Sequence, residues 1–180
     1  YNLVRPLHAF QTTTDILFVN GINAFEDGNY EAAIASLEQA RELAPEDEVL
    51  PFALSQSLFA AGQYTSSAVL LREIFDNMPR DRETLFYPRG LYKEEELLES
   101  QIDILNDKTE NNPFNGDLNL LLAYHRLGTG KFDKVEEPLK RAELDKQNSV
   151  AVAIMKDLLE KSLENVYNDM ETVTKTESEI

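Results

Sequence analysis

The 180-residue sequence contains no cysteine, only two histidines and no long apolar run. Without cysteine the chain cannot form disulfides, thiolate metal sites or a thiol nucleophile, and the redox state of its compartment stays open. No apolar stretch approaches the roughly 20 residues that a membrane-spanning helix needs, so we expect no insertion into a membrane. No signal peptide is visible either.

Basic residues are also scarce, with 17 Lys and Arg against 33 Asp and Glu, which gives a formal net charge of −16. Such a charge repels nucleic acid, which is a polyanion, so we expect no nucleic-acid partner. Hydrophobic residues nevertheless make up 42% of the chain, which excludes a disordered class. The length fits a single domain with a sizeable core.

The sequence begins at Tyr1 rather than at methionine. From this start we expect a fragment or a processed product, and a signal or anchor removed upstream stays open. The start and the acidic, cysteine-free composition favour an exported or periplasmic bacterial domain, with a cytoplasmic location left open.

What the sequence does contain is a repeat with a period of 34 residues. Residues 28–45 read GNYEAAIASLEQARELAP and residues 62–79 read GQYTSSAVLLREIFDNMP, with Gly, Tyr, Leu and Pro at matching places. The same register continues through two further rows without a gap. It aligns Leu37, Leu71, Leu105 and Leu139 in one column, and Pro45, Pro79 and Pro113 in another. A fixed period of this length indicates stacked supersecondary units.

Each repeat predicts a pair of helices. Segments 15–26 and 31–43 carry apolar residues at helical spacing. Between them, Gly28 supplies the left-handed residue that suits a helix exit, and Pro45 ends the second helix. Small residues at Gly21 and Ala33 would let the two helices approach closely. Because one pair cannot bury both of its faces, we expect it to stack on the next pair.

These residues resemble the tetratricopeptide repeat family. The first unit supplies the family's pattern at Gly21, Gly28, Tyr30, Ala33, Leu37, Ala40 and Pro45. The second supplies Ser55, Gly62, Tyr64, Ser67, Leu71 and Pro79, and the fourth supplies Ala123, Gly130, Phe132, Leu139 and Ala142. The resemblance covers about residues 14–147. It implies an all-α fold, a right-handed superhelical stack of antiparallel helix pairs, or α-solenoid.

We therefore expect one domain of about four repeat units, at 14–47, 48–81, 82–115 and 116–149, after an N-terminal extension at 1–13. The third unit is degenerate, because Pro88 and Gly90 fall where its first helix should run. We expect that helix to be short or broken and the second to run from about Lys93 to Lys108. The acidic run 94–96 would lie in its first turn, where the helix dipole favours negative charge. A cation site is the alternative interpretation.

Beyond the fourth unit, residues 149–167 carry apolar side chains at helical spacing. They are Val152, Met155, Leu158, Leu159, Leu163 and Val166. We expect one amphipathic helix at 150–171 that caps the exposed end of the stack, followed by a flexible tail at 172–180.

No motif for catalysis or for metal binding emerges. His8 and His125 lie in no helical histidine pair and near no spaced set of metal ligands. The GTGK stretch at 128–131 lacks the first glycine of a phosphate-binding loop, and Pro113 occupies a ligand position of a calcium-like loop at 111–116. No nucleophile has a plausible base. We therefore expect no enzyme, no cofactor and no metal.

The family resemblance implies a concave groove lined by the first helix of each pair. Carried onto this chain, the groove positions include Phe18 and Ile22 in the first unit, Phe52 and Gln56 in the second, and Leu120 and Tyr124 in the fourth. Three neighbouring positions, Phe25, Phe59 and Leu127, could belong to the core instead. An apolar groove of this kind would be a large exposed patch, unusual unless something covers it. The groove also lacks the lysines and asparagines with which family members clamp acidic chaperone tails, so we do not expect that activity.

The leading hypothesis is a non-catalytic protein-interaction scaffold that binds an apolar or aromatic helix or extended peptide in this groove. Its acidic rim would favour basic flanks on the ligand. The second hypothesis is a structural spacer or self-assembly module of a larger protein. In that case the apolar N-terminal segment, or a second copy in a homo-oligomer, would fill the groove. A third, an enzyme acting through the acidic clusters, would need two carboxylates that converge in a pocket.

Overall fold

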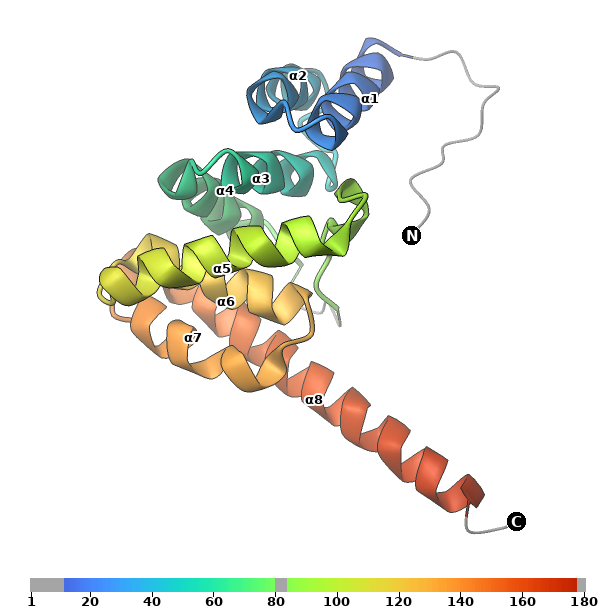
Figure 1. The fold of residues 1–180 in the computed structure, drawn as a ribbon, viewed down its shortest axis with the longest axis vertical. Coiled ribbons are helices and arrows are strands. Elements are labelled where there is room, and N and C mark those ends of the chain that lie inside the picture. The colour runs from blue at the N-terminus through green and yellow to red at the C-terminus, as the bar shows by residue number, and fades with distance from the viewer. Residues whose placement is uncertain (1–11, 80–83, 178–180) are drawn as a thin grey trace.

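The structure is a computed structural model that describes residues 12–79 and 84–177, and every regular element in these ranges is helical. The α-helices are α1 (Thr13–Glu26), α2 (Tyr30–Leu43), α3 (Leu50–Ala60), α4 (Tyr64–Asp76), α5 (Glu95–Asn111), α6 (Gly116–Gly128), α7 (Glu136–Ala142) and α8 (Ser149–Glu177). Short 3₁₀ turns lie at Arg89–Leu91, Phe132–Lys134 and Lys146–Asn148. The helices stack in successive layers (Figure 1), and the predicted all-α solenoid is confirmed.

The glycine and leucine columns have direct structural counterparts. Gly28, Gly62 and Gly130 end the first helices of their pairs with φ of 75°, 75° and 76°, a left-handed conformation that only glycine adopts without strain. The four leucines of the leucine column are all fully buried. A Cβ at Gly21 would lie 2.7 Å from Cγ of Leu37, so the small residue does allow α1 and α2 to approach closely.

The core divides into two clusters of buried side chains. The first lies among α1, α2 and α3 and includes Leu37, Leu50 and Leu91. The second joins α3 and α4 to the helices of the C-terminal half and includes Phe75 and Tyr124. Each cluster takes side chains from more than one repeat unit, so each unit depends on its neighbours.

The described part of the third unit has no α-helix before α5, in line with the short or broken helix that Pro88 and Gly90 predict. Residues 84–94 hold one 3₁₀ turn, and α5 begins only at Glu95, with Glu94 as its N-cap and Glu95 and Glu96 in its first turn. Helix α4 packs directly against α6 and α8. Helix α5 crosses between the α3–α4 layer and the α6–α7 layer (Figure 1).

The C-terminal helix is longer than predicted. Its first half covers the end of the stack with four buried residues, Ala151, Val152, Met155 and Leu158. The helix then continues to Glu177 and projects away from the body (Figure 1). Residues 172–177, expected to form a flexible tail, are helical, while 178–180 lie outside the described residues. The proposed N-terminal extension at 1–13 also lies largely outside the described residues. Helix α1 begins at Thr13 with a capping box between Thr12 and Asp15.

Candidate functional site: the filled inner groove

The predicted groove residues come from α1, α3 and α6, but most of them are not on a surface. Phe52, Gln56, Leu120 and Tyr124 are 3%, 2%, 0% and 1% exposed. Phe18 and Ile22 are partly buried against the first core cluster. Phe25, Phe59 and Leu127, whose assignment was open, belong to the core. Phe52, Gln56, Leu120 and Tyr124 are thus buried rather than exposed in an open groove, and for Phe18 and Ile22 the groove stays a prediction.

The chain itself fills this space, through residues 84–92, TLFYPRGLY, which we call the inner segment. The Phe86 ring lies 5.2 Å from the Phe52 ring, between centroids. The Tyr124 hydroxyl lies 3.5 Å from the Phe86 carbonyl oxygen. At its other end, Leu91 is buried in the first core cluster. The inner segment therefore runs over α1, α3 and α6, along the side chains that the sequence assigned to the groove.

Tyr87 makes the closest contact of the inner segment with α6. Its ring lies so near Gly128 that a methyl group at Gly128 would overlap it. Its hydroxyl is hydrogen-bonded to Nδ1 of His125 at 2.8 Å, and its ring centroid lies 5.3 Å from that of Tyr124. Burial raises the pKa of Tyr87 well above its usual value and lowers the pKa of His125 to about 3. Both side chains are therefore neutral at neutral pH.

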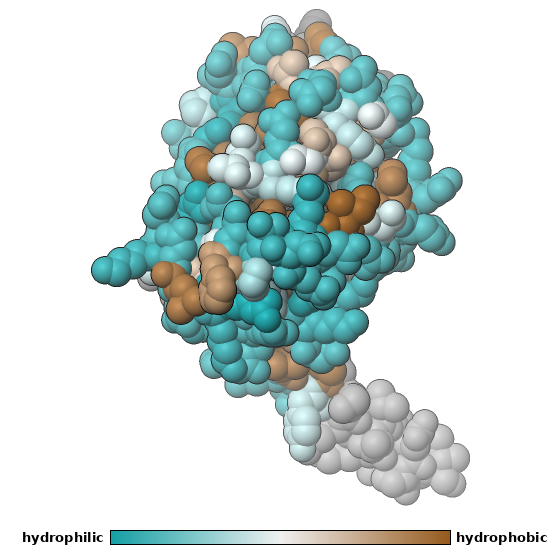
Figure 2. Space-filling view, turned by 60° about the vertical axis from the view of Figure 1, so that its left-hand side comes forward, coloured by the Kyte–Doolittle hydropathy of each residue, from teal (hydrophilic) through white to brown (hydrophobic). Residues whose placement is uncertain are grey.

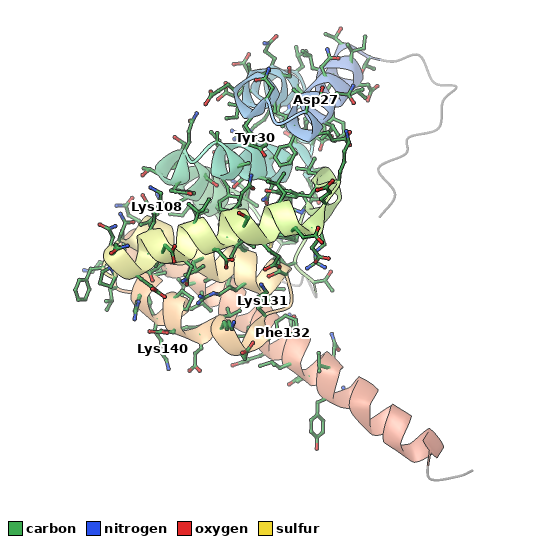
Figure 3. The ribbon with its side chains drawn as sticks, in the orientation of Figure 1. Asp27, Tyr30, Lys108, Lys131, Phe132 and Lys140 are labelled. Carbon is green, nitrogen blue, oxygen red and sulfur yellow. The ribbon has the colours of Figure 1, made fainter. Side chains whose placement is uncertain are left out.

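Tyr92 holds the other end of the inner segment through a chain of hydrogen bonds. Gln56 Nε2 donates to the Tyr92 hydroxyl at 2.8 Å, and that hydroxyl donates to Gln101 Oε1 at 2.6 Å. Gln101 Nε2 then donates to the Tyr30 hydroxyl at 3.1 Å, which lies where α2 begins (Figure 3). The Tyr92 ring also packs edge-on against Phe25, with 5.0 Å between the centroids. Burial raises the pKa of Tyr92, so this phenol stays protonated as the chain of bonds requires.

Ion pairs between side chains of different elements lie around this region. Lys93 Nζ lies 3.0 Å from Glu26 Oε2 at the end of α1, and Lys131 pairs with Glu99 of α5 (Figure 3). Glu99 belongs to an acidic face of α5, where Arg89 also lies 3.5 Å from Glu95. Because Glu95 and Glu99 have basic partners and Glu95 and Glu96 lie in the first turn, the acidic face of α5 accords with a solvated helix start whose dipole favours negative charge.

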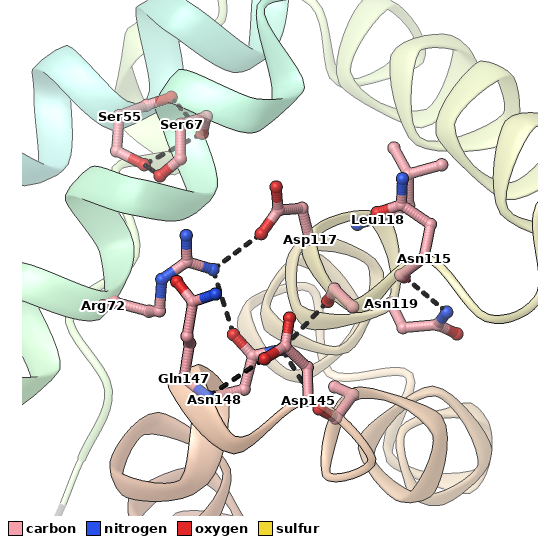
Figure 4. A network of polar contacts seen from close by, with 12 residues as sticks. Ser55, Ser67, Arg72, Asn115, Asp117, Leu118, Asn119, Asp145, Gln147 and Asn148 are labelled. Atoms are coloured by element: carbon pink, nitrogen blue, oxygen red, sulfur yellow. Dashed lines mark hydrogen bonds and ion pairs between the residues drawn. The ribbon is translucent and has the colours of Figure 1, made fainter.

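A polar network joins α4 to the C-terminal half (Figure 4), and the sequence analysis did not predict it. Arg72 Nη1 donates to Asp117 Oδ1 at 2.6 Å and to Asn148 Oδ1 at 3.0 Å. Asn148 in turn donates to the carbonyl oxygens of Gly116 at 3.2 Å and Ala142 at 3.0 Å. The network satisfies polar groups where α4, α6 and the start of α8 meet, so its role is structural.

The described residues include no cluster of three or more His, Cys, Asp or Glu side chains arranged to hold a metal ion. Within the same part of the chain, no helix has both the length and the apolar character to cross a membrane. The buried histidine and tyrosines face one another and the core, where they hold the inner segment in place.

The fold thus defines a helical-repeat protein, and the comparisons with known proteins name the repeat. The family model described as Tetratricopeptide repeat matches residues 24–84, and the predicted resemblance to this family is confirmed. A solved structure of a thermophilic TPR protein from Thermus thermophilus is similar at 20% identity. The match covers 88% of this chain and 90% of that one, with a TM-score of 0.36. No curated protein matches the chain.

Proposed function

We propose that this chain is a non-catalytic structural or self-assembly module whose inner groove is permanently held by its own inner segment. Tetratricopeptide repeats serve in general as scaffolds for protein–protein interactions, and the structural role is a special case of that general function. The observation that carries it is Tyr87, whose ring packs against Gly128 and whose hydroxyl is bonded to buried His125. Partner contacts then fall to the outer surfaces of the stack.

The hydrogen bonds of the inner segment support this role. If the segment left, Gln56 and His125 would lose their bonds to Tyr92 and Tyr87 while remaining at the floor of an apolar groove. A buried polar group without a partner costs about 1–3 kcal/mol, so an incoming peptide would have to replace these bonds as well as the packed rings. One face of the molecule, seen in Figure 2, is largely hydrophilic with small scattered apolar patches.

Binding of an apolar helix or extended peptide in the groove stays a prediction and is the second candidate function. It would require the inner segment to leave the groove first. The earlier alternative, in which the N-terminal segment fills the groove, lies outside the described residues. In the proposed function, residues 84–92 occupy the groove in place of the N-terminal segment.

Phe52→Lys and Tyr124→Lys distinguish the two candidate functions. In a filled groove both positions are core, so either lysine should lower the melting temperature sharply and reduce the helix content measured by circular dichroism. Val69→Lys is the matched control, because Val69 is exposed on α4 and should melt like the wild type. Unchanged melting of the Phe52 and Tyr124 variants, together with loss of partner capture, would instead support an open peptide groove.

A further inference from the structure

A small polar cavity lies where α5, α6 and α7 meet, apart from the inner segment. Its volume is about 90 Å³. Thr109 of α5, Asn119 and Leu122 of α6 and Pro138 of α7 line it with buried side chains. The cavity therefore joins the last helix of the third repeat unit to both helices of the fourth.

The repeat register explains why space is left at this junction. The 34-residue column that contains Asn119 is otherwise apolar, with Leu17, Pro51 and Leu85. Thr109 follows Phe75 by one period, and Phe75 is fully buried in the second core cluster. Asn119 and Thr109 are smaller and polar, so they leave unfilled a volume that large apolar side chains take up at the equivalent places of other units.

Asn119 presents a buried acceptor that has no donor. Its side chain is fully buried, and Nδ2 donates to the carbonyl oxygens of Pro113 at 3.0 Å and Asn115 at 2.8 Å (Figure 4). These two bonds fix which end of the amide is the nitrogen, because a carbonyl oxygen only accepts. Oδ1 of Asn119 then has no hydrogen-bond partner among the described residues. Buried polar atoms are nearly always hydrogen-bonded, so we expect a donor in the cavity.

The arginines at the rim of the cavity are already bound to other groups. Arg126 donates to the Lys134 carbonyl oxygen at 2.9 Å and to Asn106 Oδ1 at 2.6 Å. Arg141 pairs with Glu137 one turn away on α7. Two arginines and two glutamates line the cavity in all, so their formal charges cancel. The site thus lacks a donor rather than a charge, which favours a small neutral ligand.

We propose that this cavity binds ordered water, which links α5, α6 and α7 by hydrogen bonds. At about 30 Å³ for each molecule, the volume of about 90 Å³ holds about three waters. One of them donates to Asn119 Oδ1. Another donates to Oγ1 of Thr109, whose own proton is used on the Leu105 carbonyl oxygen at 2.8 Å and whose lone pairs can accept. This site is independent of the proposed function of the inner segment.

The test is a nuclear Overhauser spectrum between water and the methyl groups of the full chain in solution. The Thr109 methyl should show a cross-peak of the sign given by water that stays bound for longer than about a nanosecond. The methyl of Thr65, which is exposed on α4, is the matched control and should show only the opposite sign of rapidly exchanging water. Thr109→Val keeps methyl groups at this place and removes the hydroxyl that would relay the signal by proton exchange, so its cross-peak should persist.

Asn119→Leu should reduce the Thr109 cross-peak several-fold, because it replaces the buried acceptor by an apolar group of similar size. Circular dichroism checks that this variant folds, and if it does not, the spectra of the wild type and Thr109→Val decide. A wild type without the long-lived signal at Thr109, or a folded Asn119→Leu chain that keeps it, would overturn the proposal. So would a crystal structure in which Arg141 turns into the cavity and donates to Asn119 Oδ1, since the protein would then supply the donor itself.

Discussion

At the scale of single residues, the contact of Tyr87 with Gly128 fixes the path of the inner segment. A methyl group at Gly128 would overlap the ring, so Gly128→Ala should displace Tyr87 and destabilise the protein by roughly 1–3 kcal/mol, as overpacking does. Chemical denaturation of the purified variant measures this change in the free energy of unfolding.

A double-mutant cycle controls this prediction. In a Tyr87→Ala background the ring is absent, and Gly128→Ala should become neutral or stabilising, because alanine is the better helix former by about 1 kcal/mol. Equal effects of Gly128→Ala in both backgrounds would mean that the ring does not lie on this glycine.

His125 should make stability depend on pH. Burial lowers its pKa from 6.5 to about 3, so between these values the unfolded chain binds a proton that the folded chain does not. The contribution of His125 to the free energy of unfolding is fully present above about pH 6.5. As the pH falls toward 3, the free energy of unfolding decreases by up to about 1.4 kcal/mol per pH unit. We expect unfolding free energies of the wild type to fall between pH 7 and 5 by more than those of His125→Gln. Parallel pH profiles would show that His125 is not buried in its neutral form.

At the scale of helices, a substitution in one core cluster should destabilise the helices of that cluster before those of the other. Leu37 lies in the cluster formed by α1, α2 and α3, and Leu37→Ala should cost roughly 2–5 kcal/mol. Hydrogen exchange should accelerate first in α1 and α2, since repeat units support mainly their neighbours. Leu43→Ala is the control, because this leucine is exposed at the end of the same α2 helix. Uniform loosening of all helices in Leu37→Ala would contradict the local picture.

The helices themselves could largely be predicted from the sequence. Gly28, Gly62 and Gly130 mark the turns, and the leucine column marks the buried face, because both follow from local backbone and spacing rules. Pro88 and Gly90 also predicted that the first helix of the third unit would be short or broken, and residues 84–94 hold only a 3₁₀ turn. No local rule predicts where residues 84–92 lie once they form no α-helix, because their position depends on packing between units that are distant in the sequence.

At the scale of the whole molecule, the lost helix explains why the predicted site differs from the observed one. The groove positions of Phe52 and Tyr124 were taken from a regular stack, which leaves its inner face open. Here residues 84–92 lie in that space instead and bring aromatic rings to both. The sequence did carry a signal of this burial in the LFY stretch at residues 85–87. Large apolar and aromatic side chains are stabilised by burial, so a cluster of them in a segment that forms no helix indicates that the segment packs against the core.

The most direct test of the filled groove is a nuclear Overhauser spectrum of the wild-type protein in solution. The account predicts strong cross-peaks from the Tyr87 ring protons to the Gly128 α-protons and the His125 ring, with the Gly128 α-protons shifted upfield by the ring. If those cross-peaks are missing and Gly128 resonates at an ordinary helical position, the inner segment lies elsewhere and the groove is open.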